Sequence, residues 1–131
     1  MNTPPAENPL SAFLAYEDVA AAAAWLQRSF GFTEDAGSRM LGADGSVKHA
    51  EVRAGAALLI LGNPGIHGDS PRQGVSTMLI VRVPDVDEHY RRAREAGAEI
   101  VIAATDEPWG VRRYQARDPE GHQWQFEQPL G

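Results

Sequence analysis

A histidine and a carboxylate two positions apart are the clearest candidates for chemistry in this chain. His49 and Glu51 fall within residues 47–53, where apolar and polar side chains alternate as they do on a half-buried strand. Side chains two positions apart on a strand point to the same side, roughly 7 Å apart. A histidine beside a carboxylate can act as a general base, form half of an improvised metal site, or be a hydrogen-bonded residue with no chemistry. His49 and Glu51 are therefore candidates both for catalysis and for binding.

An aromatic residue in a loop and the two arginines that follow it form a second group of candidates. Trp109 lies among the turn residues 106–110, where no core position is evident, and is a candidate for a pocket lid or a dimer contact. Of Arg112 and Arg113, one guanidinium facing a pocket would suit an anionic ligand, although a solvated strand end explains both arginines equally well. The sequence leaves open which of the two points inward.

Two helices that repeat one pattern must position these residues. The first begins after Asp18 and ends at Gly31; the second begins after Asp85 and ends near Gly97. Their apolar residues fall on one face of each helix, with an offset of 67 positions between the copies: Val19, Ala23, Leu26 and Phe30, then Val86, Tyr90 and Ala93. The repeat predicts two copies of one unit with a pocket between them.

Strand-like segments surround each helix in the same order. One strand precedes each helix and three follow it, at 10–16, 32–35, 47–53 and 57–61 in the first half, and near Met78 to Arg82, then at 99–103, 111–117 and 122–127 in the second. We therefore predict a single domain over residues 1–131, comprising an extended arm (1–9), a first module (10–62), a linker (63–74) and a second module (75–129). The arm is expected either to be disordered or to lie across a dimer partner.

Composition narrows the class of protein. The chain of 131 residues has the length of one domain, and without cysteine it has neither a disulfide framework nor a thiolate nucleophile. A net charge of −6 with no basic stripe argues against nucleic acid and anionic membrane surfaces as partners. The N-terminus lacks the basic start and apolar core of a signal peptide, and no apolar run approaches about 20 residues. A cytoplasmic protein is expected.

Four motifs of the chain resemble those of the glyoxalase/bleomycin-resistance/dioxygenase superfamily, also called the vicinal oxygen chelate superfamily. They are Tyr16 to Ala22, Phe30-Gly31-Phe32, Asp44 to Glu51, and Pro108 to Trp124. The resemblance covers about residues 9–129. It implies an α+β fold of two βαβββ modules, paired into a cupped, mostly antiparallel eight-stranded sheet, with the site inside the cup. It also implies a homodimer. The superfamily includes metal-dependent isomerases and lyases, extradiol dioxygenases, and proteins that sequester antibiotics, so the fold alone does not identify the chemistry.

The resemblance also indicates where a metal would be bound. Metal-dependent members place four ligands, usually His and Glu, on the first and last strands of each module, and these positions correspond here to Ser11, Leu59, Met78 and Gln125. None of these side chains carries an imidazole or a carboxylate, which such metals prefer. Glu127, two positions after Gln125 and on the same side of its strand, supplies one carboxylate. We therefore predict that the protein has no metal and no other cofactor.

The strands that line the expected cup present a mixture of apolar and polar side chains, as small-molecule pockets do. The predicted ligand-binding residues are Phe13, His49, Glu51, Leu59, Met78, Ile80, Arg82, Trp109, Gln125 and Glu127. The leading hypothesis is a metal-free protein of the bleomycin-resistance type that sequesters an aromatic or antibiotic-like ligand. A second is an isomerase, lyase or dioxygenase-like enzyme that uses His49 and Glu51 as acid and base, or an atypical metal. A third is a paralogue that has lost its function.

Overall fold

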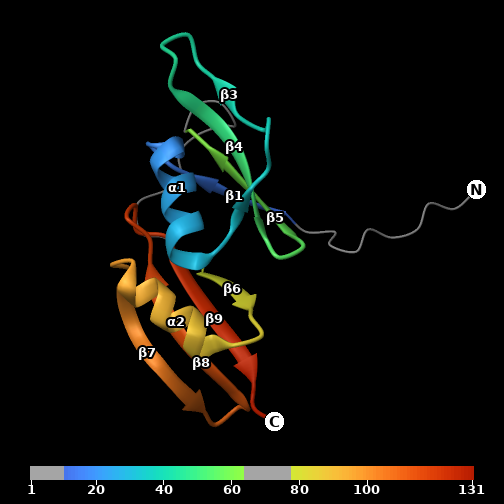
Figure 1. Ribbon diagram of the computed structural model, residues 1–131, viewed down its shortest axis with the longest axis vertical. Helices are drawn as coiled ribbons and strands as arrows, with labels where there is room; N and C mark the ends of the chain where they lie inside the picture. The colour runs from blue at the N-terminus through green and yellow to red at the C-terminus, as the bar shows by residue number, and fades with distance from the viewer. Residues whose placement is uncertain (1–10, 64–77) are drawn as a thin grey trace, which may run out of the picture. The chain divides into compact units, whose positions relative to one another are not determined.

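In a computed structural model of the chain, residues 11–63 and 78–131 are described, and they divide into two compact units (Figure 1). Residues 11–23 and 32–63 belong to the first unit, and residues 24–31 and 78–131 to the second. The helix α1 (Val19–Phe30) therefore contributes residues to both units. The predicted arm at 1–9 and all but Asn63 of the predicted linker at 63–74 lie outside the described residues.

The first unit contains one mixed sheet. Its strand order is β1-β5-β4-β2, with the short β3 also paired to β4: β1 (Ala12–Ala15), β5 (Ala57–Gly62), β4 (Val47–Ala54), β2 (Thr33–Glu34) and β3 (Met40–Leu41). The strand β1 runs parallel to β5, and the other pairs are antiparallel. A two-residue turn at 55–56 joins β4 to β5. The strands predicted from the sequence are present, together with the additional strand β3.

The second unit repeats this connectivity around the helix α2 (Val86–Glu95). Its sheet has the order β6-β9-β8-β7: β6 (Met78–Arg82), β9 (Gln123–Pro129), β8 (Val111–Arg117) and β7 (Glu99–Glu107). Again the first strand runs parallel to the last, and the remaining pairs are antiparallel. The α+β fold with two repeated modules, predicted from the sequence, is confirmed.

Both helices begin at the aspartates predicted to cap them. The carboxylate of Asp18 accepts a hydrogen bond from the Ala21 amide at 3.0 Å, and that of Asp85 accepts one from the Glu88 amide at 3.1 Å. The Asp85–Glu88 hydrogen bond is one half of a capping box, and the side chain of Glu88 pairs with Arg91 instead of completing it.

Glycine ends both helices because the chain there adopts a left-handed backbone. Gly31 has φ of 74° and Gly97 has φ of 88°. A Cβ atom at Gly31 would also lie 3.0 Å from Nη1 of Arg92. The guanidinium of Arg92 donates to the carbonyl oxygens of Gln27 (3.2 Å) and Arg28 (3.3 Å), at the end of α1. Arg92 thus pairs with carbonyl groups at the end of α1, and the Gln27 carbonyl also accepts a hydrogen bond from the Gly31 amide at 3.1 Å.

Aromatic side chains fill the core of the second unit. The ring of Phe30, from the end of α1, lies 4.7 Å from that of Phe126 and 5.6 Å from that of Trp124. Phe126 also packs against His89 of α2, with ring centroids 4.1 Å apart. Trp124 and Phe126 are fully buried and belong to this core.

Neither helix could cross a bilayer. The helices in the described parts of the chain have 12 and 10 residues, well short of the roughly 20 needed for a span.

Candidate functional site

The side chains of the second sheet alternate between the buried face under α2 and an opposite, open face. Because Trp124 and Phe126 occupy the buried face, their neighbours on β9 must point the other way. Strand register then places residues of three strands on the open face: Ile80 and Arg82 of β6, Gln125 and Glu127 of β9, and Arg113 and Gln115 of β8. We call this surface the open face of the second sheet.

Gln125 lies at the centre of this open face and uses both ends of its amide. Its Oε1 accepts hydrogen bonds from Nη1 of Arg113 (3.0 Å) and Nε2 of Gln115 (2.9 Å). Its Nε2 donates to Oε1 of Glu127 at 3.0 Å, and Nη2 of Arg82 lies 3.6 Å from the other oxygen of Glu127. Gln125 is only 6% exposed, so the cost of burying its amide is offset by these hydrogen bonds. The structure thus brings together Arg82, Gln125 and Glu127, three of the predicted binding residues.

Arg113 is the arginine that belongs to this face. Its Nε lies 3.3 Å from Oε1 of Glu107, an ion pair without the geometry of a hydrogen bond. The centre of its guanidinium lies 5.4 Å from the ring centroid of Trp109, a cation–π contact. Arg112 instead pairs with Asp87 of α2 at 2.9 Å and with Asp106 at 3.0 Å. The question that the sequence left open is therefore answered in favour of Arg113.

Apolar and aromatic groups lie beside these polar groups. Ile80 is 57% exposed and Trp109 is 63% exposed, although side chains of this size are usually buried. Met78, on the same strand as Ile80, is half-buried. The open face therefore offers an apolar edge, an exposed indole ring and a fixed guanidinium.

The first sheet carries the predicted histidine and carboxylate on one side. Nε2 of His49 lies 3.4 Å from Oε2 of Glu51, and both side chains are partly buried. Glu51 pairs with Ile60 of β5, which in turn pairs with Phe13 of β1. Phe13 is 43% exposed. His49, Glu51 and Phe13 therefore share a face, as the alternation of the sequence predicted, and Ile60 joins them.

Leu59 does not lie on this face, and its predicted position was wrong. It pairs with the fully buried Val52 and is itself buried, so it belongs to the core side of the sheet. Leu59 was assigned as the counterpart of Gln125 by aligning Gly55 with Gly121. The two turns differ, however, because the turn between β4 and β5 has two residues and that between β8 and β9 has five. The alignment was therefore one residue out of register, and Ile60 holds the position assigned to Leu59.

The residues at the superfamily's metal positions do not fit a metal. Ser11 and Met78 offer a hydroxyl and a thioether, Ile60 offers no donor in place of Leu59, and the amide of Gln125 is held by its neighbours. Hard cations and zinc prefer carboxylate, carbonyl or imidazole groups. Across residues 11–63 and 78–131, no three His, Asp or Glu side chains gather as a metal site would require. We therefore derive no chemistry through a metal at these positions.

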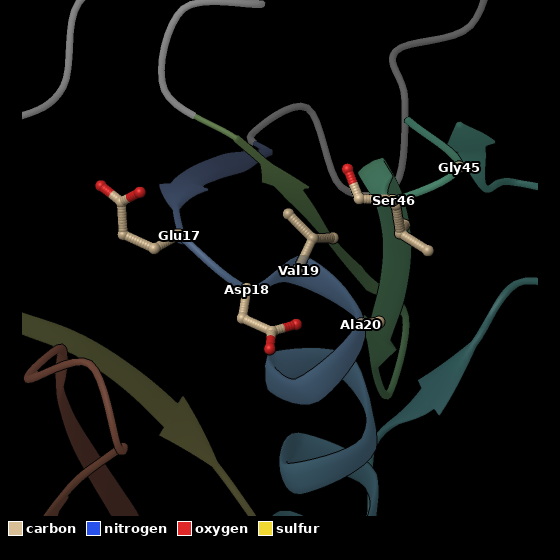
Figure 2. Close-up of a pocket in the computed structure, with 7 residues that line it drawn as sticks. Glu17, Asp18, Val19, Ala20, Gly45 and Ser46 are labelled. Carbon is tan, nitrogen blue, oxygen red and sulfur yellow. The ribbon is translucent and has the colours of Figure 1, made fainter. Parts of the chain in front are cut away.

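A hollow of about 390 Å³ lies elsewhere in the first unit, between the start of α1 and the start of β4 (Figure 2). It is lined by Glu17, Asp18, Val19, Ala20, Gly45, Ser46 and Val47. The carboxylate of Asp18 is turned toward its own helix, where it accepts the hydrogen bond from Ala21. None of the predicted site residues lines this hollow, so we place the candidate site on the open sheet faces.

Sequence reasoning missed the buried histidine of α2. His89 Nδ1 is hydrogen-bonded to the hydroxyl of Tyr114, and burial lowers the pKa of His89 to about 4. Burial also raises the pKa of the Tyr114 hydroxyl. The signal was the helical spacing, because His89 lies three positions after the buried Val86 and four before the buried Ala93.

Residues 9–126 match the Glyoxalase/Bleomycin resistance protein/Dioxygenase superfamily, and the chain belongs to this superfamily. It is 38% identical to TioX from Micromonospora sp. ML1, covering 93% of this chain and 96% of that chain with a TM-score of 0.74. It is 32% identical to an uncharacterised protein of Mycobacterium tuberculosis (strain ATCC 25618 / H37Rv), over 95% of this chain and 76% of that protein.

The fold is also shared with a superfamily enzyme from Burkholderia phytofirmans PsJN. The two chains are 20% identical with a TM-score of 0.75, and the match covers 92% of this chain and 97% of that chain. At this level of identity the likeness concerns the fold.

Proposed function

We propose that this protein binds a small, partly aromatic organic molecule without a metal and sequesters it on the open faces of its sheets. The observation that carries the proposal is the buried amide of Gln125, fixed by Arg113, Gln115 and Glu127 beside the exposed side chains of Ile80 and Trp109. A ligand would cover these two apolar side chains, and each Å² of apolar surface removed from water stabilises a complex by roughly 25 cal/mol. The polar groups are already ordered, so little entropy is lost when they bind.

An antibiotic-like ligand is the form of this proposal that membership of the superfamily favours. The superfamily's description includes bleomycin-resistance proteins. Aromatic natural products would present to Trp109 and Ile80 the flat, apolar surface that those side chains can cover. We further propose that the protein acts as a homodimer, in which a partner subunit completes the enclosure of the ligand.

A second candidate function is catalysis by the His49–Glu51 pair. The separation of 3.4 Å between His49 Nε2 and Glu51 Oε2 lets the carboxylate orient the imidazole. In an isomerase or lyase reaction the imidazole would then remove a proton from carbon or return it. A glutamine at position 51 would keep the shape of the side chain and remove its charge, so Glu51→Gln tests this role.

Thermal-shift screening and calorimetry against a panel of aromatic natural products test the binding function. We expect at least one compound to raise the unfolding temperature and to bind with one molecule per site, unchanged after incubation. His49→Ala should retain most of this shift. Turnover that is lost in His49→Ala and Glu51→Gln while binding survives would replace the sequestering function with the enzymatic one. Stoichiometric iron, zinc, nickel or manganese in the purified protein would contradict the metal-free site.

A further inference from the structure

The guanidinium of Arg113 is held on three sides. Its Nη1 donates to Gln125, its Nε faces Glu107, and its plane lies near the ring of Trp109. Only 14% of its side chain is exposed. An arginine fixed in this way has lost most of its rotamer freedom before any ligand arrives, so a further hydrogen bond to it costs little entropy.

One donor group of this guanidinium is still available. Among the described residues, no acceptor pairs with Nη2 of Arg113, while its other two nitrogens face Gln125 and Glu107. Both carboxylates of the cluster already face a cation: Glu107 faces Arg113, and Glu127 faces Arg82. Arg82 contributes further guanidinium donors at the rim, since its side chain is 69% exposed. The groups left for a ligand are therefore chiefly donors attached to positive charge.

We propose that Arg113 is the anion-recognition residue of this site, and that the ligand is an aromatic carboxylate or a comparable aromatic oxyanion. This inference rests on the proposed binding function and names the ligand class for the same site. The anionic oxygen accepts a hydrogen bond from Nη2 of Arg113, and the aromatic part of the ligand lies against Trp109. Positive charge next to Gln125 thus comes from Arg113.

Hydrogen bonds between a guanidinium and a carboxylate are shorter and roughly twice as strong as neutral ones, which favours an anion over a neutral amide of the same shape. The ring of Trp109 adds selectivity for flat molecules, because its indole is 63% exposed and an aromatic ligand can lie against it. Arg113, which also contacts this indole, holds the anionic group of the same ligand. Gln125 acts through Arg113 as a positioning residue.

Three probes that share one ring system test the ligand class directly: 2-naphthoate, 2-naphthamide and 2-naphthylmethylammonium. Calorimetric titration of the whole 131-residue chain should give binding of the naphthoate that is roughly tenfold or more tighter than that of the amide, with the ammonium weakest. The order of the three probes requires no variant. Equal or tighter binding of the ammonium would overturn the inference, because the carboxylates would then dominate the site. Binding of none of the probes would overturn it too.

Substitutions on β8 test whether the affinity for naphthoate depends on Arg113. Arg113→Met should weaken naphthoate binding by roughly tenfold to a hundredfold, and Arg113→Lys should restore part of the affinity. Arg117→Met is the matched control: Arg117 lies on the same strand and the same face, where it pairs with Glu99 at 3.6 Å. The affinity of the Arg117→Met variant for naphthoate should stay within about twofold of that of the wild type. An equal loss in Arg113→Met and Arg117→Met would show non-specific charge attraction and refute the assignment.

Failure of this inference and failure of the binding function are distinguishable. If the naphthoate does not bind but a neutral or cationic natural product does, the protein remains a binding protein and Arg113 is not its anion-recognition residue. Should Arg113→Met fail to fold, as judged by circular dichroism, the probe order on wild type and the result for Arg113→Lys still decide the matter.

Discussion

Nδ1 of His89 and the hydroxyl of Tyr114 form a hydrogen bond in the core of the second unit, joining α2 to β8. The centroid of the imidazole lies 5.9 Å from that of the Phe30 ring and 4.1 Å from that of the Phe126 ring. Burial favours the neutral imidazole, in which Nδ1 can accept the tyrosine proton. Protonation would turn Nδ1 into a donor and place a charge among aromatic rings.

Stability should therefore fall in mild acid. Burial lowers the pKa of His89 from 6.5 to about 4, so between these values the unfolded chain binds a proton that the folded chain does not. Stability from this group is complete above pH 6.5 and is lost progressively as the pH falls toward 4. After discounting for the partial exposure of the ring, the loss is on the order of 2 kcal/mol. Urea unfolding across this pH range measures it; His89→Gln should flatten the slope, whereas His122→Gln should keep it.

Removing the tyrosine hydroxyl should destabilise the second unit. Tyr114→Phe leaves Nδ1 of His89 without its hydrogen-bond partner, at a cost of about 1–3 kcal/mol. The neighbouring Tyr90→Phe serves as the control, because Tyr90 is only half-buried. Urea unfolding at neutral pH measures both variants. Equal stability of the two variants would show that the hydrogen bond contributes nothing net.

The two helix-ending glycines should differ in their tolerance of a methyl group. Both Gly31→Ala and Gly97→Ala impose a left-handed backbone on an L-residue, at a cost of about 1 kcal/mol. Only at position 31 does the new Cβ meet another group, Nη1 of Arg92 at 3.0 Å. Thermal unfolding should therefore show the larger loss for Gly31→Ala. In an Arg92→Ala background the excess should disappear; if it persists, the contact with Arg92 is not its cause.

Replacing Gln125 with an apolar residue should cost stability as well as binding. Gln125→Leu leaves Nη1 of Arg113 and Nε2 of Gln115 without their common acceptor, which predicts a loss of about 1–3 kcal/mol. Gln123→Leu, two positions earlier on the same face, is the comparison, since Gln123 is only half-buried. Chemical unfolding of the two variants should separate them clearly. A Gln125→Leu protein as stable as wild type would mean that the amide network does not stabilise the fold.

Two tryptophans should give opposite results when truncated. Trp109→Ala should change the free energy of unfolding by less than about 0.5 kcal/mol, because its indole is 63% exposed, yet it should weaken ligand binding. Trp124→Ala should cost about 3–5 kcal/mol, because its ring is fully buried and donates to Asp118 at 3.2 Å. Unfolding curves and a binding titration on the same samples test both. A large loss of stability in Trp109→Ala would assign it to the core instead.

The sequence was sufficient for the helices and for every described strand except the short β3, and insufficient for two details of the site. Helical spacing identified the buried stripe from Val19 to Phe30, and the capping aspartates were recognisable because their chemistry is local. The face of Leu59 depended on the length of a turn, and turn length decides the register of everything after it.

The orientation of Arg113 was not readable for a different reason. Arg112 and Arg113 are chemically identical neighbours, and only the positions of Asp87, Glu107 and Gln125 in space distinguish them. His89 was missed because a histidine on a helix is usually solvated, and its burial depends on rings contributed by β8 and β9.

Because α1 contributes residues to both units, it affects how the chain folds during synthesis and whether its two halves can be separated. Phe30, encoded in the first half, packs on Trp124 and Phe126 of the last strand, so its core partners leave the ribosome almost a hundred residues later. A polypeptide ending in the joint between the modules would expose Phe30 to water. The gene therefore contains a duplicated pattern without containing two separable proteins, and we expect the two halves to be recovered in folded form only when they are expressed together.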